Sequence, residues 1–302
     1  MDQRRVSHAQ SLQSRGAPYH KFSEFINPVH DRFTVLNALL SELDFHYSVV
    51  QFGDSRHFFV SSTGKERPAR VLAAHYDSVT GSPGANDNAS SVFILVRAAL
   101  ELKKKTGIPW MVIFTDNEEL AGEKGIRAQG SYLLGRGLKN TDLAGADFFV
   151  FDSCGRGDTL IISTTADYIM KKETGGGIAT AQKKLKDLRN NAMLAAEHSS
   201  QQHYMLLPTP FSDDAGFLHA GLAAQMITTL PGSEAAAFAS LSRANPRYTH
   251  ALFNRDLQKE LDMTLLPATW NRLNGPEDTE EFLTPEYFAG MVKFAITLAR
   301  RT

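Results

Sequence analysis

Short apolar runs alternate with longer stretches of helical periodicity along most of this 302-residue sequence. Four of the runs are bounded by polar residues, as expected of strands that are buried on both faces of a sheet. They are Val71–Ala74, Trp110–Phe114, Phe148–Phe151 and Ala223–Thr228. Two further runs, Tyr47–Phe52 and His57–Ser61, flank a turn at Gly53-Asp54. This arrangement predicts an antiparallel strand pair at the edge of the sheet.

Helical periodicity fills the intervals between these runs. Apolar residues recur at helical spacing from Phe22 to Leu43, which predicts that residues 1–45 form a helical N-terminal extension. Further helices are expected over roughly 89–105, 125–134, 177–198 and 285–301, the last of them opened by Thr284-Pro285. The segment 231–270 has weak periodicity, and we interpret it as an insertion suited to form a lid.

The alternation of strands and helices favours one α/β domain. The sequence contains no internal repeat and no linker rich in Pro, Gly or Ser, so residues 1–302 are expected to form a single domain. Strands that are separated by helices typically pair in parallel. We therefore predict a mixed, mostly parallel central sheet flanked by helices.

Composition and charge exclude several classes of function. Lys and Arg number 32 against 33 Asp and Glu, so no overall positive field attracts nucleic acid or anionic lipid. No apolar stretch reaches the roughly 18 residues of a membrane helix, and residues 1–10 are not followed by the apolar run of a signal peptide. The single cysteine, Cys154, forms no internal disulfide. These features predict a cytoplasmic protein without nucleic-acid or membrane partners, and they leave its oligomeric state open.

Acidic residues and one histidine follow the carboxyl ends of the predicted central strands. His75 and Asp77 follow the first, Glu118-Glu119 the second and Asp152 the third, while Asp87 lies in a Gly- and Asn-containing turn between the first two. Ligand sites in open α/β sheets lie at this edge of the sheet. The sequence thus predicts that these side chains converge.

Each acid taken alone has an ordinary explanation, because Asp87 could cap a helix and Glu118-Glu119 could complement a helix dipole. Their convergence would bring like charges together, which is strongly unfavourable without a cation. Zinc accepts imidazole and carboxylate ligands, and a carboxylate can bridge two ions about 3.5–4 Å apart. A further carboxylate is then needed to take a proton from the activated water, and Glu118 is placed for that role.

These residues resemble the co-catalytic zinc aminopeptidases of the bacterial leucyl aminopeptidase type, whose relatives include the glutaminyl cyclases. The resemblance runs from about Val71 to the C-terminus and rests on five segments. They are AAHYDS, PGANDNASSV, FTDNEELAGEKGIRAQGSYLL, FDSCG and PFSDDAGFLHAGLAAQ. It implies a zinc-exopeptidase-like fold and a two-zinc site.

The resemblance also implies a role for each residue. His75 and Asp152 would bind one zinc ion, Glu119 would bind the other, and Asp87 would bridge the two. Asp77 would orient His75, and Glu118 would act as the general base and then as the general acid.

One position departs from the family pattern. The family has a histidine ligand for the second ion four residues before a final aspartate, and this sequence has Asn274 there, before Asp278. An amide oxygen is a weaker zinc ligand than imidazole, so the second ion is expected to bind more weakly or to be replaceable by another divalent metal. The alternative is that His250, from the segment 231–270, takes over as ligand. The histidine that usually follows Ser-Asp in the family is also replaced, by Asp214.

The leading functional hypothesis is a metal-dependent exopeptidase that removes the N-terminal residue from a peptide or aminoacyl substrate. A glutaminyl-cyclase-like or other amide hydrolase is the nearest alternative. By resemblance the cyclase zinc uses the final histidine, which this chain lacks. A non-catalytic relative that binds peptide or metal is the third hypothesis, but such a protein would not need the general base Glu118.

Overall fold

The computed structural model describes residues 12–63, 68–105, 107–119, 125–172, 178–199 and 203–300. Residues 1–10, on which the expectation about a signal peptide rests, lie outside these ranges, as does the first part of the predicted 1–45 extension. Within the described residues, no helix is long and apolar enough to span a membrane.

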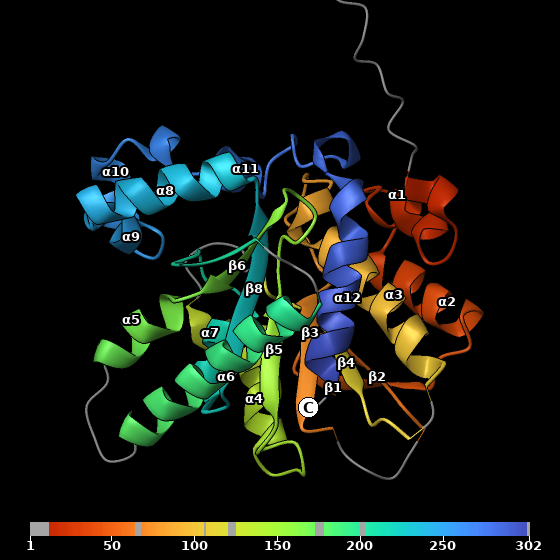
Figure 1. Cartoon of the computed structure of the whole chain (residues 1–302). Helices are drawn as coiled ribbons and strands as arrows, with labels where there is room; N and C mark the ends of the chain where they lie inside the picture. Colours follow the sequence, from red (N-terminus) through yellow and green to blue (C-terminus); the bar gives the residue numbers. More distant parts are fainter. Residues whose placement is uncertain are drawn as a thin grey trace, which may run out of the picture.

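An eight-stranded sheet forms the centre of the described chain (Figure 1). Its strands are β1 (Tyr47–Phe52), β2 (Ser55–Ser61), β3 (Arg70–His75), β4 (Met111–Thr115), β5 (Asp147–Phe151), β6 (Thr159–Ser163), β7 (Tyr204–Leu207) and β8 (Ala224–Leu230). The order is β1-β2-β4-β3-β5-β8-β6-β7. Strands β4, β3, β5 and β8 pair in parallel, and β1, β2 and β6 pair antiparallel with their neighbours, apart from the parallel β6–β7 pair. The predicted α/β class with a mixed, mostly parallel sheet is confirmed.

Successive residues of the buried strands enter two different cores, because side chains alternate across a sheet. In β3, Leu72 and Ala74 join the larger core, which also contains the apolar faces of α3 (Ser91–Lys103), α6 (Ile178–His198) and α12 (Phe288–Ala299). Val71 and Ala73 join the core formed with α4 (Gly130–Leu138) and α7 (Asp213–Ala220). Helices thus cover both faces of the sheet (Figure 1).

The N-terminal helical region is broken, where the sequence predicts continuous periodicity. The short turns η1 (Leu12–Arg15) and η2 (Tyr19–Lys21) precede α1 (Phe22–Phe25), and α2 covers Arg32–Glu42. Pro28 lacks an N–H group and disfavours helical geometry in the residue before it. Asp31 then caps α2 by accepting a hydrogen bond from the Thr34 N–H.

Residues 231–270 are largely helical despite their weak periodicity. They form α8 (Gly232–Ala244), α9 (Arg247–Ala251), α10 (Arg255–Glu260) and η5 (Met263–Leu265), and α11 (Ala268–Arg272) begins at their end. These helices gather beside one end of β6 and β8 (Figure 1). Their own small core includes Phe238 and Trp270, whose rings lie 5.0 Å apart, together with Ile161 and Leu230 of the sheet.

The remaining elements connect the sheet to its helices. They are η3 (Ala85–Ser90), η4 (Ile126–Ala128), α5 (Thr165–Lys172), η6 (Glu280–Phe282) and η7 (Pro285–Tyr287).

Candidate metal centre

His75 is the last residue of β3, and its side chain is fully buried. Its Nδ1 lies 3.4 Å from Asp77 Oδ1. The two oxygens of Asp77 also accept hydrogen bonds from the backbone N–H groups of Glu118 and Glu119, at 3.3 and 3.0 Å. Burial opposes ionisation of Asp77, but its interactions with the His75 imidazole and with the two backbone N–H groups together outweigh burial and lower its pKa. Asp77 therefore orients the imidazole and holds the loop after β4 beside it.

Asp87 approaches the His75 imidazole from the turn between β3 and α3. Its Oδ1 lies 3.1 Å from His75 Nε2, on the side of the ring opposite Asp77. The turn is held by Asp278, which accepts hydrogen bonds from the N–H groups of Asn86 at 2.8 Å and Asp87 at 2.9 Å. Asp278 is fully buried. Sequence reasoning treated it only as a marker of the final motif and missed this positioning role.

Arg32 is a second residue that sequence reasoning missed. Its guanidinium donates hydrogen bonds to the carbonyl oxygens of Tyr76, Asp77, Pro83 and Gly84. These carbonyls belong to the two ends of the loop that joins His75 to Asp87. The buried cation therefore clamps this loop, although no nearby sequence motif includes it.

Asp152 follows β5 and completes the first group. Its Oδ2 lies 3.7 Å from His75 Nε2, and its Oδ1 accepts a hydrogen bond from the Ser153 hydroxyl at 2.9 Å. Burial opposes its ionisation, but the interactions with His75, Ser212 and Ser153 together outweigh burial and lower its pKa. One ligand atom each from His75, Asp87 and Asp152 lies within 4.8 Å of the others.

Glu118 and Glu119 approach from the loop after β4. With His75 they form a second group whose ligand atoms lie within 4.8 Å of one another. Gln129 Nε2 donates a hydrogen bond of 3.0 Å to Glu118 Oε1. Burial, followed by repulsion from Glu119, raises the pKa of Glu118 well above its ordinary value even though His75 opposes this.

The donor set fits a divalent metal. His75 Nε2, Asp87 Oδ1 and Glu119 Oε1 are buried and have no hydrogen-bond partner within the described ranges, which is costly unless a ligand pairs them. Burial and the charge of Asp152 raise the pKa of Asp87 to about 6. Burial and the charge of Asp87 raise that of Glu119 to about 9. A divalent cation would relieve this repulsion, and zinc accepts these nitrogen and oxygen ligands.

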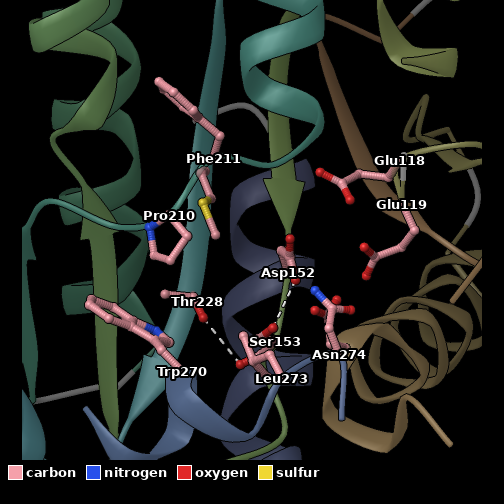
Figure 2. Close-up of a pocket in the computed structure, with 12 residues that line it drawn as sticks. Glu118, Glu119, Asp152, Ser153, Pro210, Phe211, Thr228, Trp270, Leu273 and Asn274 are labelled. Carbon is pink, nitrogen blue, oxygen red and sulfur yellow. Dashed lines mark hydrogen bonds between the residues drawn. The ribbon is translucent and has the colours of Figure 1, made fainter. Parts of the chain in front are cut away.

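A cavity of about 90 Å³ opens in front of these groups. Figure 2 shows Glu118, Glu119 and Asn274 on one side of it and Pro210, Phe211 and Trp270 on the other. Asp87 and Asp152 also line it, and Met226, Thr228, Leu273 and Ser153 complete the lining. The acidic groups thus face an apolar wall, part of which comes from α11 at the end of the segment 231–270.

The two alternatives for the missing histidine lie in different places. Asn274 has a left-handed backbone, with φ of 63°, and lines the cavity beside the carboxylates. His250 is exposed, and its ring packs against Tyr168 and Phe253 with centroids 5.7 and 6.1 Å away. It is not among the residues that line the cavity. The structure therefore brings Asn274 to the site and leaves His250 outside it.

Two further buried acids lie at the start of α7. Thr115 Oγ1 donates to Asp213 Oδ2, and the Ser212 N–H donates to Asp214 Oδ1 at 3.2 Å. Burial raises the pKa of Asp213 to about 6 and that of Asp214 to about 7. Neither residue is among those that line the cavity.

The chain was compared with protein families and with solved structures. The sequence pattern of peptidase family M28 matches residues 60–258. The LapA aminopeptidase of Legionella pneumophila has a TM-score of 0.60 at 17% identity, covering 95% of this chain and 69% of LapA. The glutaminyl cyclase of Porphyromonas gingivalis has a TM-score of 0.60 at 14% identity, covering 96% of each chain. No curated protein matches the chain by sequence.

BSAP, a zinc aminopeptidase from Bacillus subtilis, has a TM-score of 0.53 at 20% identity. The similar region covers 82% of this chain but only 50% of BSAP, so this chain spans about half the length of that enzyme. At these identities, the solved structures show a common fold.

Proposed function

The chain belongs to peptidase family M28, and from this premise we propose that it is a metal-dependent aminopeptidase. Its substrate is a peptide or aminoacyl compound with a free N-terminus, and its resident metal is zinc. The observation that carries the proposal is the convergence of His75, Asp87 and Asp152 at one point, with Glu118 on the same cavity. A binding protein needs the first three residues but has no use for the fourth.

The proposed ligands of the tight zinc position are His75, Asp87 and Asp152. Bound there, zinc would lower the pKa of a water molecule and polarise the scissile carbonyl. The carboxylate of Asp77, at 3.4 Å from Nδ1, keeps the imidazole turned so that Nε2 faces Asp87 and Asp152.

Glu118 is the proposed general base and general acid. Its carboxylate takes a proton from the attacking water and returns it to the amine that leaves when the peptide bond breaks. Burial favours the protonated form of this carboxyl, and that is the form needed in the second step. The hydrogen bond from Gln129 fixes one carboxyl oxygen and leaves the other free for the proton.

A second ion would have Asp87, Glu119 and the Asn274 amide as neighbours. Because this set lacks an imidazole, we propose that the second ion binds more weakly than the first or is replaceable by another divalent metal.

Glu118→Gln tests the proposed mechanism. The variant retains every proposed ligand but cannot carry the proton, so turnover of aminoacyl amides should fall by about 10²- to 10⁴-fold. Zinc content, measured by elemental analysis, should stay at the wild-type level. Glu286→Gln, at an exposed position in η7, is the matched control and should behave as wild type. Near-normal turnover in Glu118→Gln would refute the role assigned to this residue.

Glutaminyl cyclisation is the second candidate, because 96% of this chain and 96% of the Porphyromonas gingivalis enzyme correspond. Peptides with N-terminal glutamine separate the two activities. An aminopeptidase releases free glutamine, whereas a cyclase releases ammonia and leaves the peptide bond intact. A zinc-loaded protein that does neither on a broad panel would support a non-catalytic role.

A further inference from the structure

The position that a second ion would take has an unusual set of neighbours. Glu119 contributes a buried Oε1 without a hydrogen-bond partner in the described part of the chain, and Asp87 lines the same cavity. The third neighbour is the amide of Asn274. Among the residues that the structure describes, Glu119 shares a ligand group only with His75 and Glu118. His75 is already a proposed ligand of the first zinc position. What is left combines negative charge and oxygen acceptors with a poor set of zinc ligands.

We propose that this position binds the α-ammonium group of the substrate, an inference that rests on the proposed function. An ammonium group has three donors and no acceptor, and Asp87, Glu119 and the Asn274 side-chain oxygen supply three acceptors. It also brings the positive charge that the carboxylate cluster requires. An α-amino group has a pKa of about 8 and is mostly protonated at neutral pH.

This assignment explains how the site selects the first peptide bond. In an aminoacyl group, one carbon atom separates the α-nitrogen from the carbonyl. An ammonium group held by Glu119 and Asn274 therefore leaves the carbonyl beside His75, Asp87 and Asp152. Internal peptide bonds and blocked N-termini lack the cation. The apolar wall across the cavity, which includes Phe211 and Trp270 (Figure 2), then faces the side chain of the first residue.

Ligand binding tests the proposal without turnover. Leucinamide and its uncharged 2-hydroxy analogue are titrated calorimetrically into the Glu118→Gln variant loaded with one equivalent of zinc. Leucinamide should bind at least about tenfold more tightly, since it alone forms charged hydrogen bonds. Adding Asn274→Ala should weaken leucinamide binding by about tenfold or more and leave the analogue unaffected. Asn140→Ala, at an exposed position, is the control and should change neither affinity.

Metal content provides an independent measurement. Equilibrium dialysis should find one tightly bound zinc ion in the wild type and two in Asn274→His, where imidazole completes the second position. In the wild type, excess zinc should weaken leucinamide binding by competition. Two equally tight ions in the wild type, or equal affinities for leucinamide and its analogue, would overturn the proposal. Selective ammonium binding without any hydrolysis would instead refute the proposed function and leave this inference standing.

Discussion

Asp278→Asn tests how the proposed ligand Asp87 is held in place. The Asp278 carboxylate is fully buried and accepts the N–H groups of Asn86 and Asp87 at 2.8 and 2.9 Å. The substitution keeps the side-chain shape but turns an NH₂ group toward one of these N–H donors. A hydrogen bond to a charged group contributes about 1.5–3 kcal/mol, and an unpaired buried donor costs about 1–3 kcal/mol. We expect the free energy of unfolding to fall by about 2–4 kcal/mol.

Zinc affinity should fall as well, by about 10- to 100-fold, because substitutions behind a metal ligand commonly have effects of this size. Urea denaturation of the metal-free protein measures stability, and equilibrium dialysis measures zinc affinity. Glu277→Gln is the matched control: it is the preceding residue, its side chain is 72% exposed, and its partner Arg272 is 3.7 Å away. Exposed pairs contribute about 0–1 kcal/mol. Wild-type zinc affinity in Asp278→Asn would show that the turn holds Asp87 without this carboxylate.

Substitutions at Gly84, Gly81 and Asp214 provide two further tests. Gly84 and Gly81 both have positive φ, of 55° and 91°, but only at Gly84 would a Cβ come within 2.5 Å of the Asp87 backbone oxygen. The positive φ should cost both alanine variants about 1–2 kcal/mol of stability, whereas only Gly84→Ala should lose further stability through this clash and also lose zinc in dialysis. Burial raises the pKa of Asp214 to about 7 from an ordinary value of 3.8, so wild-type stability should fall as the pH rises through this interval. Asp214→Asn should therefore be more stable than wild type by up to about 4 kcal/mol above pH 7 and no more stable near pH 3.8, as measured by urea denaturation; a pH-independent difference would refute this assignment.

The central strands are predictable from sequence because the fold buries them on both faces. Strands β3, β4 and β5 accordingly contain continuous apolar runs of at least four residues, and β8 is buried throughout although it includes Gln225 and two threonines. Strand β6 was missed because its apolar run is only Leu160–Ile162, and β7 because it lies at the sheet edge with most of its residues partly exposed. The helices of 231–270 were missed for a related reason, since they are short and pack around a small core of their own.

The acidic residues could be predicted to meet because their positions follow from topology alone. Parallel strands deliver their carboxyl ends to one edge of a sheet, so spacing relative to the strands is sufficient. Arg32 and Asp278 could not be found in this way. Arg32 contacts the loop from 44–52 residues away, and Asp278 holds Asp87 from 191 residues away. No periodic pattern or local motif in the sequence indicates either contact, and both are recognised only in the folded structure.

The last motif of the sequence, residues 274–278, contains two residues that contact different parts of the site. Its aspartate, Asp278, bonds to the backbone of Asp87 and so supports the position shared with His75 and Asp152. Its residue 274 lines the cavity instead, where we propose that it serves the position next to Glu119. Replacing histidine by asparagine there leaves the support of the first position intact and changes only the second. This is the pattern expected of an enzyme that keeps one tight zinc ion and uses the second position for the cation that its substrate brings.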